Sequence, residues 1–182
     1  MSEAALLMRA AEFAARAHAG QRRKGGRVPY VNHAIEVARL VAEDGRGPET
    51  VAAALLHDVV EDSDATVAQM ESAFGPEVAR IVAALTDAPD WADLPASERK
   101  ALQAAHIAGA PEEARAVKIA DQTSNVRDVG RLPAGWAPGQ AAAYIDRTGP
   151  VVDVCRSASP GLAAIYDAAV ARTRAQIAEA AG

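Results

Sequence analysis

The chain has 182 residues and a formal net charge of −5, half of its residues are hydrophobic, and only 4% are aromatic. A chain of this length can bury a sizeable core, and a composition rich in alanine and poor in aromatics is typical of packed helices rather than of a β-sandwich or barrel. The negative charge argues against a surface that binds nucleic acid.

The sequence also lacks a run of eighteen apolar residues and a basic leader followed by an apolar stretch. We therefore expect a cytoplasmic protein with no membrane segment and no nucleic-acid partner. Cys155 is the single cysteine, which excludes an internal disulfide and a cysteine-rich zinc site. Residues 1–182 are expected to form one domain.

The first predicted helix covers residues 2–18, and a loop over residues 20–32 follows it. This loop gathers four cations around a glycine pair: Arg22, Arg23, Lys24 and Arg27. A solvated basic loop would show the same pattern. In a chain of net negative charge, however, a local positive patch indicates an anionic ligand, and Arg and Lys bind phosphate oxygens well.

The second helix is predicted to run from His33 to about Glu43, with Asn32 as its N-cap and an extended Pro29–Val31 segment before it. His33 then lies in the first turn of a helix. A lone histidine at such a position is usually structural. Its significance depends on whether the fold brings it to His57.

The third predicted helix, residues 49–60, leads into a cluster of acidic side chains. Its apolar run stops at the adjacent pair His57 and Asp58, and Glu61 and Asp62 follow within one helical turn, with Glu61 on the face of the pair. A solvated helix end is the simplest interpretation. Negative charge near a helix C-terminus is nevertheless unfavourable by about 0.3–1 kcal/mol per group. A bound cation would offset this cost.

The helix that begins at Pro111 carries Asp121 in the middle of an apolar run, and Asn125 lies four residues further along the same face. A carboxylate in such a run is seldom buried without a partner. The remaining predicted helices cover residues 65–74, 76–88, 97–106 with Lys100, 139–156 with Tyr144, and 160–180. The sequence thus predicts an all-α fold of about eight to ten helices.

Four of these side chains, from three separate predicted helices, are candidate ligands of one ion: His33, His57, Asp58 and Asp121. Two imidazoles and two carboxylates leave open positions on an octahedral ion. Such a set suits Mn²⁺ or Fe²⁺ better than a closed zinc site, with Co²⁺ and Zn²⁺ as alternatives.

The order His33, His57-Asp58, Asp121 resembles the ligand pattern of the HD-domain metal-dependent phosphohydrolases. Four segments are similar to the hydrolase domain of RelA/SpoT homologues: HAGQRRKGGRVPYVNHAIEVARL, AALLHDVVEDSDAT, FGPEVARIVAALTD and VKIADQTSNVRDV. They resemble in particular the small stand-alone alarmone hydrolases of metazoan type. The resemblance covers nearly the whole chain, with no synthetase or regulatory domain attached.

This resemblance implies an all-helical HD domain that removes pyrophosphate from the 3′ position of guanosine tetra- or pentaphosphate with Mn²⁺. It implies that the four candidate ligands hold the metal, and that Glu61 and Asp62 orient and deprotonate the attacking water. Arg23 and Lys24 would grip phosphates. The positions that match the lining of the nucleotide pocket are Tyr30, Lys100, Asn125 and Tyr144.

The sequence departs from the family where the family usually reads Asp-Lys-Leu-x-Asn, because Gln122 stands in place of the lysine after Asp121. The glycine-containing loop is also shorter than in many relatives. Another HD-type activity, such as removal of the 2′-phosphate of NADPH or a nucleotidase activity, is therefore an alternative. A non-catalytic alarmone-binding module is a third, although it predicts loss of a ligand, Glu61 or Asp62, and all are present. Packing of the last helix against another subunit, in a homo-oligomer, is left open.

Overall fold

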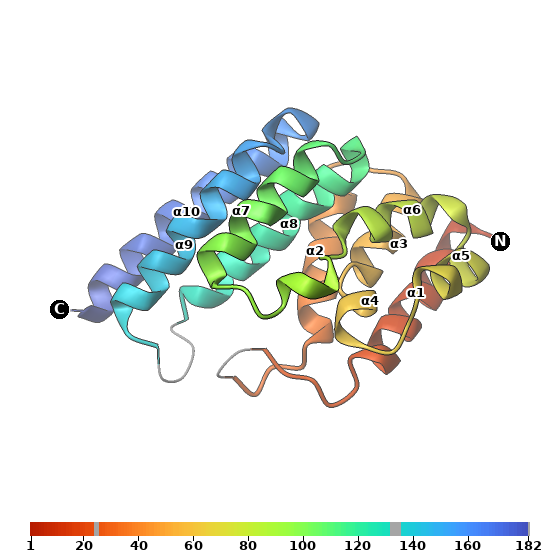
Figure 1. Ribbon diagram of the computed structural model, residues 1–182, viewed down its shortest axis with the longest axis horizontal. Coiled ribbons are helices and arrows are strands. Elements are labelled where there is room, and N and C mark those ends of the chain that lie inside the picture. Colours follow the sequence, from red (N-terminus) through yellow and green to blue (C-terminus); the bar gives the residue numbers. More distant parts are fainter. Residues whose placement is uncertain (24–25, 132–135, 182) are drawn as a thin grey trace.

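The computed structural model describes residues 1–23, 26–131 and 136–181. Its regular structure is helical, and the β-structure in this part of the chain is limited to one isolated bridge between Arg22 and Pro29 (Figure 1). The all-α prediction is confirmed. The α-helices are α1 (Glu3–Ala17), α2 (Val31–Glu43), α3 (Pro48–Leu56), α4 (Val59–Asp62), α5 (Val67–Phe74), α6 (Pro76–Leu85), α7 (Ala96–Ala108), α8 (Glu112–Val129), α9 (Pro138–Asp153) and α10 (Pro160–Ala181).

Helix α3 is the centre of the N-terminal half. Pro48 occupies its first turn, where the missing N–H costs nothing, and every residue from Thr50 to Leu56 is buried. A helix that is apolar on all sides needs partners on all sides. Helices α1, α2 and α6 supply them by packing against α3.

Helix α8 joins the two halves of the molecule. It packs on α2, α3 and α6 on the N-terminal side, and on α7, α9 and α10 on the other side (Figure 1). Most of its residues are buried, including the polar side chains Lys118, Asp121, Gln122, Thr123 and Ser124. So many buried polar groups on one helix require partners, and these partners form the site described below.

The predicted continuous helix over residues 49–60 is wrong in one respect. Helix α3 ends at Leu56, and a turn at His57 and Asp58 separates it from the short α4. Asp58 has φ −100° and ψ −2°, so the backbone leaves regular helix geometry there. In a regular helix, the adjacent side chains of His57 and Asp58 would point about 100° apart. The turn lets both side chains approach the same point.

The predicted N-cap of the second helix is also wrong. Helix α2 begins at Val31, and Tyr30 rather than Asn32 occupies the N-cap position. The N–H of Asn32 donates to the carbonyl of Pro29 and that of His33 donates to the carbonyl of Tyr30, so the chain already turns at Pro29 and Tyr30 and Asn32 lies within the first turn of α2. None of the described helices is long and apolar enough to cross a lipid bilayer.

Candidate metal centre and active site

Three of the four predicted metal ligands meet where α2 packs against the turn between α3 and α4. The ligand atoms of His33, His57 and Asp58 all lie within 4.8 Å of one another. Asp58 Oδ2 lies 3.0 Å from His57 Nε2 and 3.6 Å from His33 Nε2. Both imidazoles are buried, so the cluster faces a protein-lined space rather than bulk solvent.

Asp121 brings a second carboxylate to the same point from α8. Its Oδ1 lies 3.2 Å from His33 Nε2 and 3.8 Å from His57 Nε2. The fold thus gathers all four predicted ligands, from residues up to 88 positions apart in the chain (33 to 121). We call His33, His57, Asp58 and Asp121 the metal cluster.

The donor atoms of the metal cluster fit a divalent ion. Each histidine uses its Nδ1 in a hydrogen bond, His33 with Ser124 Oγ at 2.9 Å and His57 with the Ala54 carbonyl at 2.8 Å. Their Nε2 atoms are buried, and neither has a hydrogen-bond partner in the described part of the chain. Neighbouring ligands of an ion with bonds of about 2.1 Å stand roughly 3 Å apart. The distances between the imidazole Nε2 atoms and the carboxylate oxygens run from 3.0 to 3.8 Å, so small side-chain shifts would bring all four donors onto one ion.

The charges of the cluster favour a positive centre. Burial alone raises the pKa of Asp58, but the His57 imidazole beside it holds that pKa well below its usual range. Asp121 behaves in the same way, because contact with His33 and the charge of Lys118 outweigh its burial. Burial lowers the pKa of His57, yet Asp58 and Asp121 together raise it to about 9. Both carboxylates are therefore ionised at neutral pH.

Tyr30 positions Asp58 from the outer side of the cluster. Its hydroxyl donates a hydrogen bond of 2.5 Å to Asp58 Oδ2, and burial together with the Asp58 charge raises the tyrosine pKa far above its usual value. The guanidinium of Arg23 lies over the Tyr30 ring, 5.3 Å from its centre. Arg23 is itself held by Asp128 and Asn125, to which it donates hydrogen bonds of 2.6 Å each.

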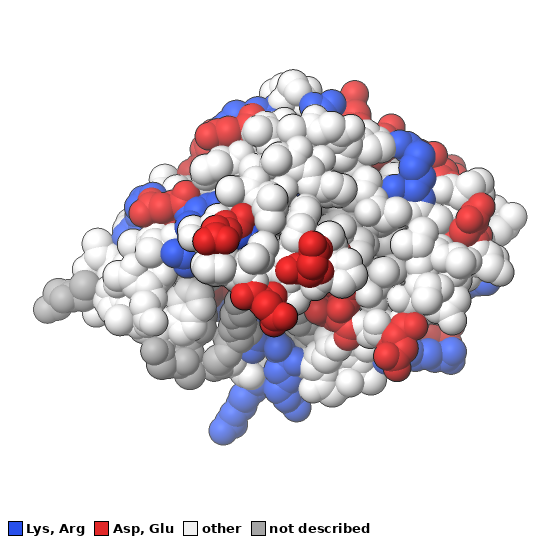
Figure 2. Space-filling model, in the orientation of Figure 1, with Lys and Arg blue, Asp and Glu red and all other residues white. Residues whose placement is uncertain are grey.

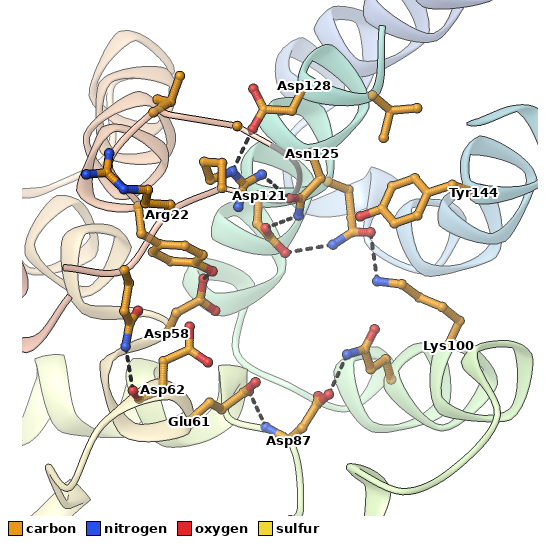
Figure 3. A pocket seen from close by; sticks show the side chains of 18 of the residues that line it. Arg22, Asp58, Glu61, Asp62, Asp87, Lys100, Asp121, Asn125, Asp128 and Tyr144 are labelled. Carbon is orange, nitrogen blue, oxygen red and sulfur yellow. Dashed lines mark hydrogen bonds and ion pairs between the residues drawn. The ribbon is translucent and has the colours of Figure 1, made fainter. Parts of the chain in front are cut away.

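Glu61 and Asp62 lie beside the cluster on the solvent side, where α4 ends (Figure 3). Partial burial of the Glu61 carboxyl, with Asp87 and Asp58 nearby, raises its pKa to about 7, and its Oε1 accepts a hydrogen bond of 2.5 Å from the Asp87 N–H. Burial and the Asp58 charge also raise the pKa of Asp62. The Gln21 side chain holds the Asp62 backbone by donating to its carbonyl at 2.8 Å.

These groups line a cavity of about 700 Å³, large enough for a nucleotide. Figure 3 shows the carboxylates of Asp58, Asp62 and Glu61 on one side of it and Lys100 and Tyr144 on the opposite side. Figure 2 shows basic side chains projecting from the lower edge of the molecule, where the loop between α1 and α2 lies in Figure 1. Within residues 1–23, 26–131 and 136–181, the cations that line the cavity are Arg22, Arg23, Arg99, Lys100, Lys118 and Arg131.

Gln122, the residue that departs from the family pattern, connects Asp121 to Lys100. Its side-chain amide donates a hydrogen bond of 2.6 Å to Asp121 Oδ2, and its carbonyl oxygen accepts one of 3.0 Å from Lys100 Nζ. Lys118 Nζ lies 3.8 Å from the same Asp121 oxygen. Two lysines therefore supply positive charge near Asp121, Lys118 directly and Lys100 through the Gln122 amide, although residue 122 itself is neutral.

The structure places five of the six predicted substrate-binding residues on the cavity wall: Arg23, Tyr30, Lys100, Asn125 and Tyr144. The sixth, Lys24, lies outside the described residues. Sequence reasoning missed Lys118 and Trp136, both of which line the cavity. Trp136 packs edge-on against Tyr144 with ring centres 5.7 Å apart. A lysine within an apolar helical run was the available signal for Lys118, since such a lysine is rarely buried without a partner.

The comparisons with known proteins decide the family. Residues 10–142 match the HD domain family. The chain belongs to the HD-domain family. An HD domain implies a divalent metal, and the cluster of His33, His57 and Asp58 agrees with that implication.

Two relatives within the HD-domain family carry the name guanosine-3′,5′-bis(diphosphate) 3′-pyrophosphohydrolase MESH1. The zebrafish protein (Danio rerio) is 39% identical over 165 residues, which cover 88% of this chain and 90% of the relative. The human protein is 43% identical over 155 residues, which cover 83% and 85%. A solved structure, described as a metazoan ortholog of SpoT that hydrolyzes ppGpp, superimposes with a TM-score of 0.84 at 35% identity over 92% of this HD-domain chain and 95% of its own.

Proposed function

We propose that this protein is a metal-dependent phosphohydrolase that removes pyrophosphate from the 3′ position of guanosine 3′,5′-bis(diphosphate) or its pentaphosphate analogue, which leaves GDP or GTP. One observation carries the proposal: the four candidate metal ligands converge beside Glu61 and Asp62 at the wall of a cavity that is also lined by cations. The names of the relatives support the choice of substrate.

In this proposal, the metal cluster holds a single divalent ion. Its two nitrogens and two carboxylates suit Mn²⁺, with Fe²⁺, Co²⁺ and Zn²⁺ as alternatives. A divalent ion bound there would withdraw charge from phosphate oxygens and lower the pKa of a water. Tyr30 keeps Asp58 oriented through the hydrogen bond described above. Asn125 Nδ2 donates a hydrogen bond of 2.6 Å to Asp121 Oδ1, and together with Gln122 it keeps Asp121 oriented.

Glu61 is the proposed general base, because a carboxyl with a pKa of about 7 is well matched to accept a proton near neutral pH. The oxygen of the attacking water bonds to the phosphorus attached to the ribose 3′-oxygen, and Glu61 takes the proton of that water. The bond between phosphorus and the 3′-oxygen breaks, pyrophosphate leaves, and the 3′-oxygen takes a proton from solvent while Glu61 returns its own to solvent. Asp62 orients the water.

The cations of the cavity are the proposed phosphate ligands. Arg23 presents its guanidinium from the loop, and Lys100 presents its ammonium from α7. Lys24 belongs to the same proposal on the basis of its sequence position. Tyr144 and Asn125 complete the lining that faces the nucleotide.

The decisive experiment measures pyrophosphate release from guanosine 3′,5′-bis(diphosphate) with and without Mn²⁺, and phosphate release from NADPH in parallel. We expect Mn²⁺-dependent release of pyrophosphate. If no pyrophosphate is released from guanosine 3′,5′-bis(diphosphate) but phosphate is released from NADPH, the proposed substrate is wrong and the proposed reaction class stands. Binding of the alarmone without turnover would support the non-catalytic alternative instead.

A further inference from the structure

His33 has two ring nitrogens that face different surroundings. Its Nε2 faces the other three members of the metal cluster and lies 3.2 Å from Asp121 Oδ1. Its Nδ1 lies 2.9 Å from Ser124 Oγ on α8. A neutral imidazole carries one proton, on one nitrogen or the other. Only the form with the proton on Nδ1 leaves the Nε2 lone pair free to bind an ion.

The hydrogen bonds of Ser124 decide where that proton sits. Ser124 Oγ lies 2.7 Å from Glu36 Oε2, and an ionised carboxylate can only accept. A serine hydroxyl has a single proton, so Ser124 donates it to Glu36. Its oxygen is then left with lone pairs only, and it must accept a hydrogen bond from His33 Nδ1–H.

Arg127 keeps Glu36 in the ionised form that this argument needs. Its Nη1 donates a hydrogen bond of 2.7 Å to Glu36 Oε1, the oxygen that Ser124 does not use. Burial alone raises the pKa of Glu36, but the hydrogen bonds from Arg127 and Ser124 hold that pKa below its usual value. The direction of the whole chain of hydrogen bonds is thereby fixed.

We propose that Ser124, Glu36 and Arg127 form a positioning relay that holds His33 in the tautomer able to bind the divalent ion through Nε2. The proposal rests on the metal site of the proposed function. Neither Glu36 nor Arg127 lines the cavity, so the relay acts only through His33.

His57 provides an internal contrast. Its Nδ1 donates to the backbone carbonyl of Ala54, an acceptor that no side-chain substitution removes. The tautomer of His57 is thus set by the local turn, whereas that of His33 depends on three side chains from α2 and α8. Of the two proposed histidine ligands, His57 has its tautomer fixed by a backbone carbonyl, and His33 has its tautomer fixed by the relay.

The first test measures the tautomer directly in the metal-free protein. Long-range ¹H–¹⁵N spectra of histidine-labelled protein distinguish a proton on Nδ1 from one on Nε2. They are recorded at a pH where the His33 imidazole is neutral. We expect Nδ1–H at His33 in the wild type. In Ser124→Ala the proton moves toward Nε2, because the carboxylates of Asp58 and Asp121 become its best acceptors, while His57 stays unchanged. Nε2–H at His33 in the wild type would overturn the relay.

The second test measures Mn²⁺ affinity from the electron paramagnetic resonance signal of the free ion. We expect Ser124→Ala to weaken binding by about 10–100-fold, the usual cost of removing a group that orients a ligand. Ser124→Thr, which keeps the hydroxyl, should restore most of the affinity. Thr123→Val is the matched control, since Thr123 is buried on the same helix and its hydroxyl, among the residues that the structure describes, bonds only to the Ile119 carbonyl.

Glu36→Ala extends the test to a residue that does not line the cavity and whose hydrogen bonds go to Ser124 and Arg127 rather than to His33. Without the carboxylate, the serine proton is free to point at Nδ1, and we expect weaker Mn²⁺ binding than in the wild type. Wild-type affinity in both Ser124→Ala and Glu36→Ala would overturn the relay. A wild-type protein that binds no Mn²⁺ would instead overturn the metal site of the proposed function, and the spectra of His33 would still decide the relay.

Discussion

The side chains around the cavity fall into two groups that are held in different ways. The metal cluster comes from α2, the turn after α3, and α8, and its members are buried or nearly so, with hydrogen bonds to fixed partners. The cations that we call the cation rim, Arg22, Arg23, Arg99 and Lys100, come from a loop and from the first turns of α7. All four are partly or fully exposed, and the hydrogen bonds of Arg23 to Asp128 and Asn125 and of Lys100 to Gln122 are ones that a phosphate oxygen could replace.

This difference matches the tasks that we propose for the two groups. An ion demands ligand positions defined to within a fraction of an ångström, which packed helices provide. A polyphosphate is long and flexible, and cations on a loop and on a helix end can adjust to it. Loss of a group from the cluster should therefore affect the chemistry, and loss of a group from the rim should affect binding.

Asp58→Ala should produce the largest effect, because it removes a proposed ligand and leaves the two buried imidazoles with Asp121 as their one remaining carboxylate in the metal cluster. We expect loss of bound metal and turnover reduced to background, measured by metal analysis and pyrophosphate release. Asp167→Ala, an exposed carboxylate on α10, is the control and should change neither. An active variant that still holds its metal would remove Asp58 from the ligand set.

Glu61→Gln should come next. The amide keeps the shape and the hydrogen bond to the Asp87 N–H but cannot take a proton, so kcat should fall by about 10²–10⁴-fold while Mn²⁺ affinity stays within a few-fold. Steady-state kinetics and ion titration measure the two quantities. Asp64→Asn, an exposed neighbour, serves as the matched control. An unchanged kcat would rule out Glu61 as the base.

Lys100→Met tests the cation rim and should have a smaller effect of a different kind. Loss of a charged hydrogen bond worth about 1.5–3 kcal/mol corresponds to a fall in kcat/KM of roughly 10–100-fold, and we expect it mainly in KM. Arg16→Met, an exposed cation on α1, should leave both constants unchanged. A drop confined to kcat would contradict the division between cluster and rim.

The pH dependence should show the smallest effect. Burial lowers the pKa of Lys100 to about 8, so its ammonium is charged below that pH and loses its proton as the pH rises through it. We expect kcat/KM to decline above pH 8 because KM rises. In Lys100→Met this decline should disappear, and its persistence in that variant would assign the decline to another group.

Much of the fold and of the site follows from the sequence. The helical periodicity and the apolar runs predict the all-α architecture, and residue types alone select His33, His57, Asp58 and Asp121 as candidate ligands. The errors concern local geometry. Asn32 is a good capping residue, but the backbone had already turned at Pro29, and the turn at His57 and Asp58 interrupts a run with continuous helical periodicity.

Other features depend on tertiary packing alone. The hydrogen bond from Lys100 to Gln122, which connects Lys100 to Asp121, joins two residues that are 22 positions apart in the chain. The hydrogen bond from Ser124 to Glu36 joins two residues that are 88 positions apart. Periodicity and capping describe neighbours along the chain, and they carry no information on which side chains meet across helices. The sequence by itself therefore determined the helices and the chemical types of the site. Only the packing of α8 against α2, α3 and α7 decided which polar groups orient the ligands and where the compensating charges lie.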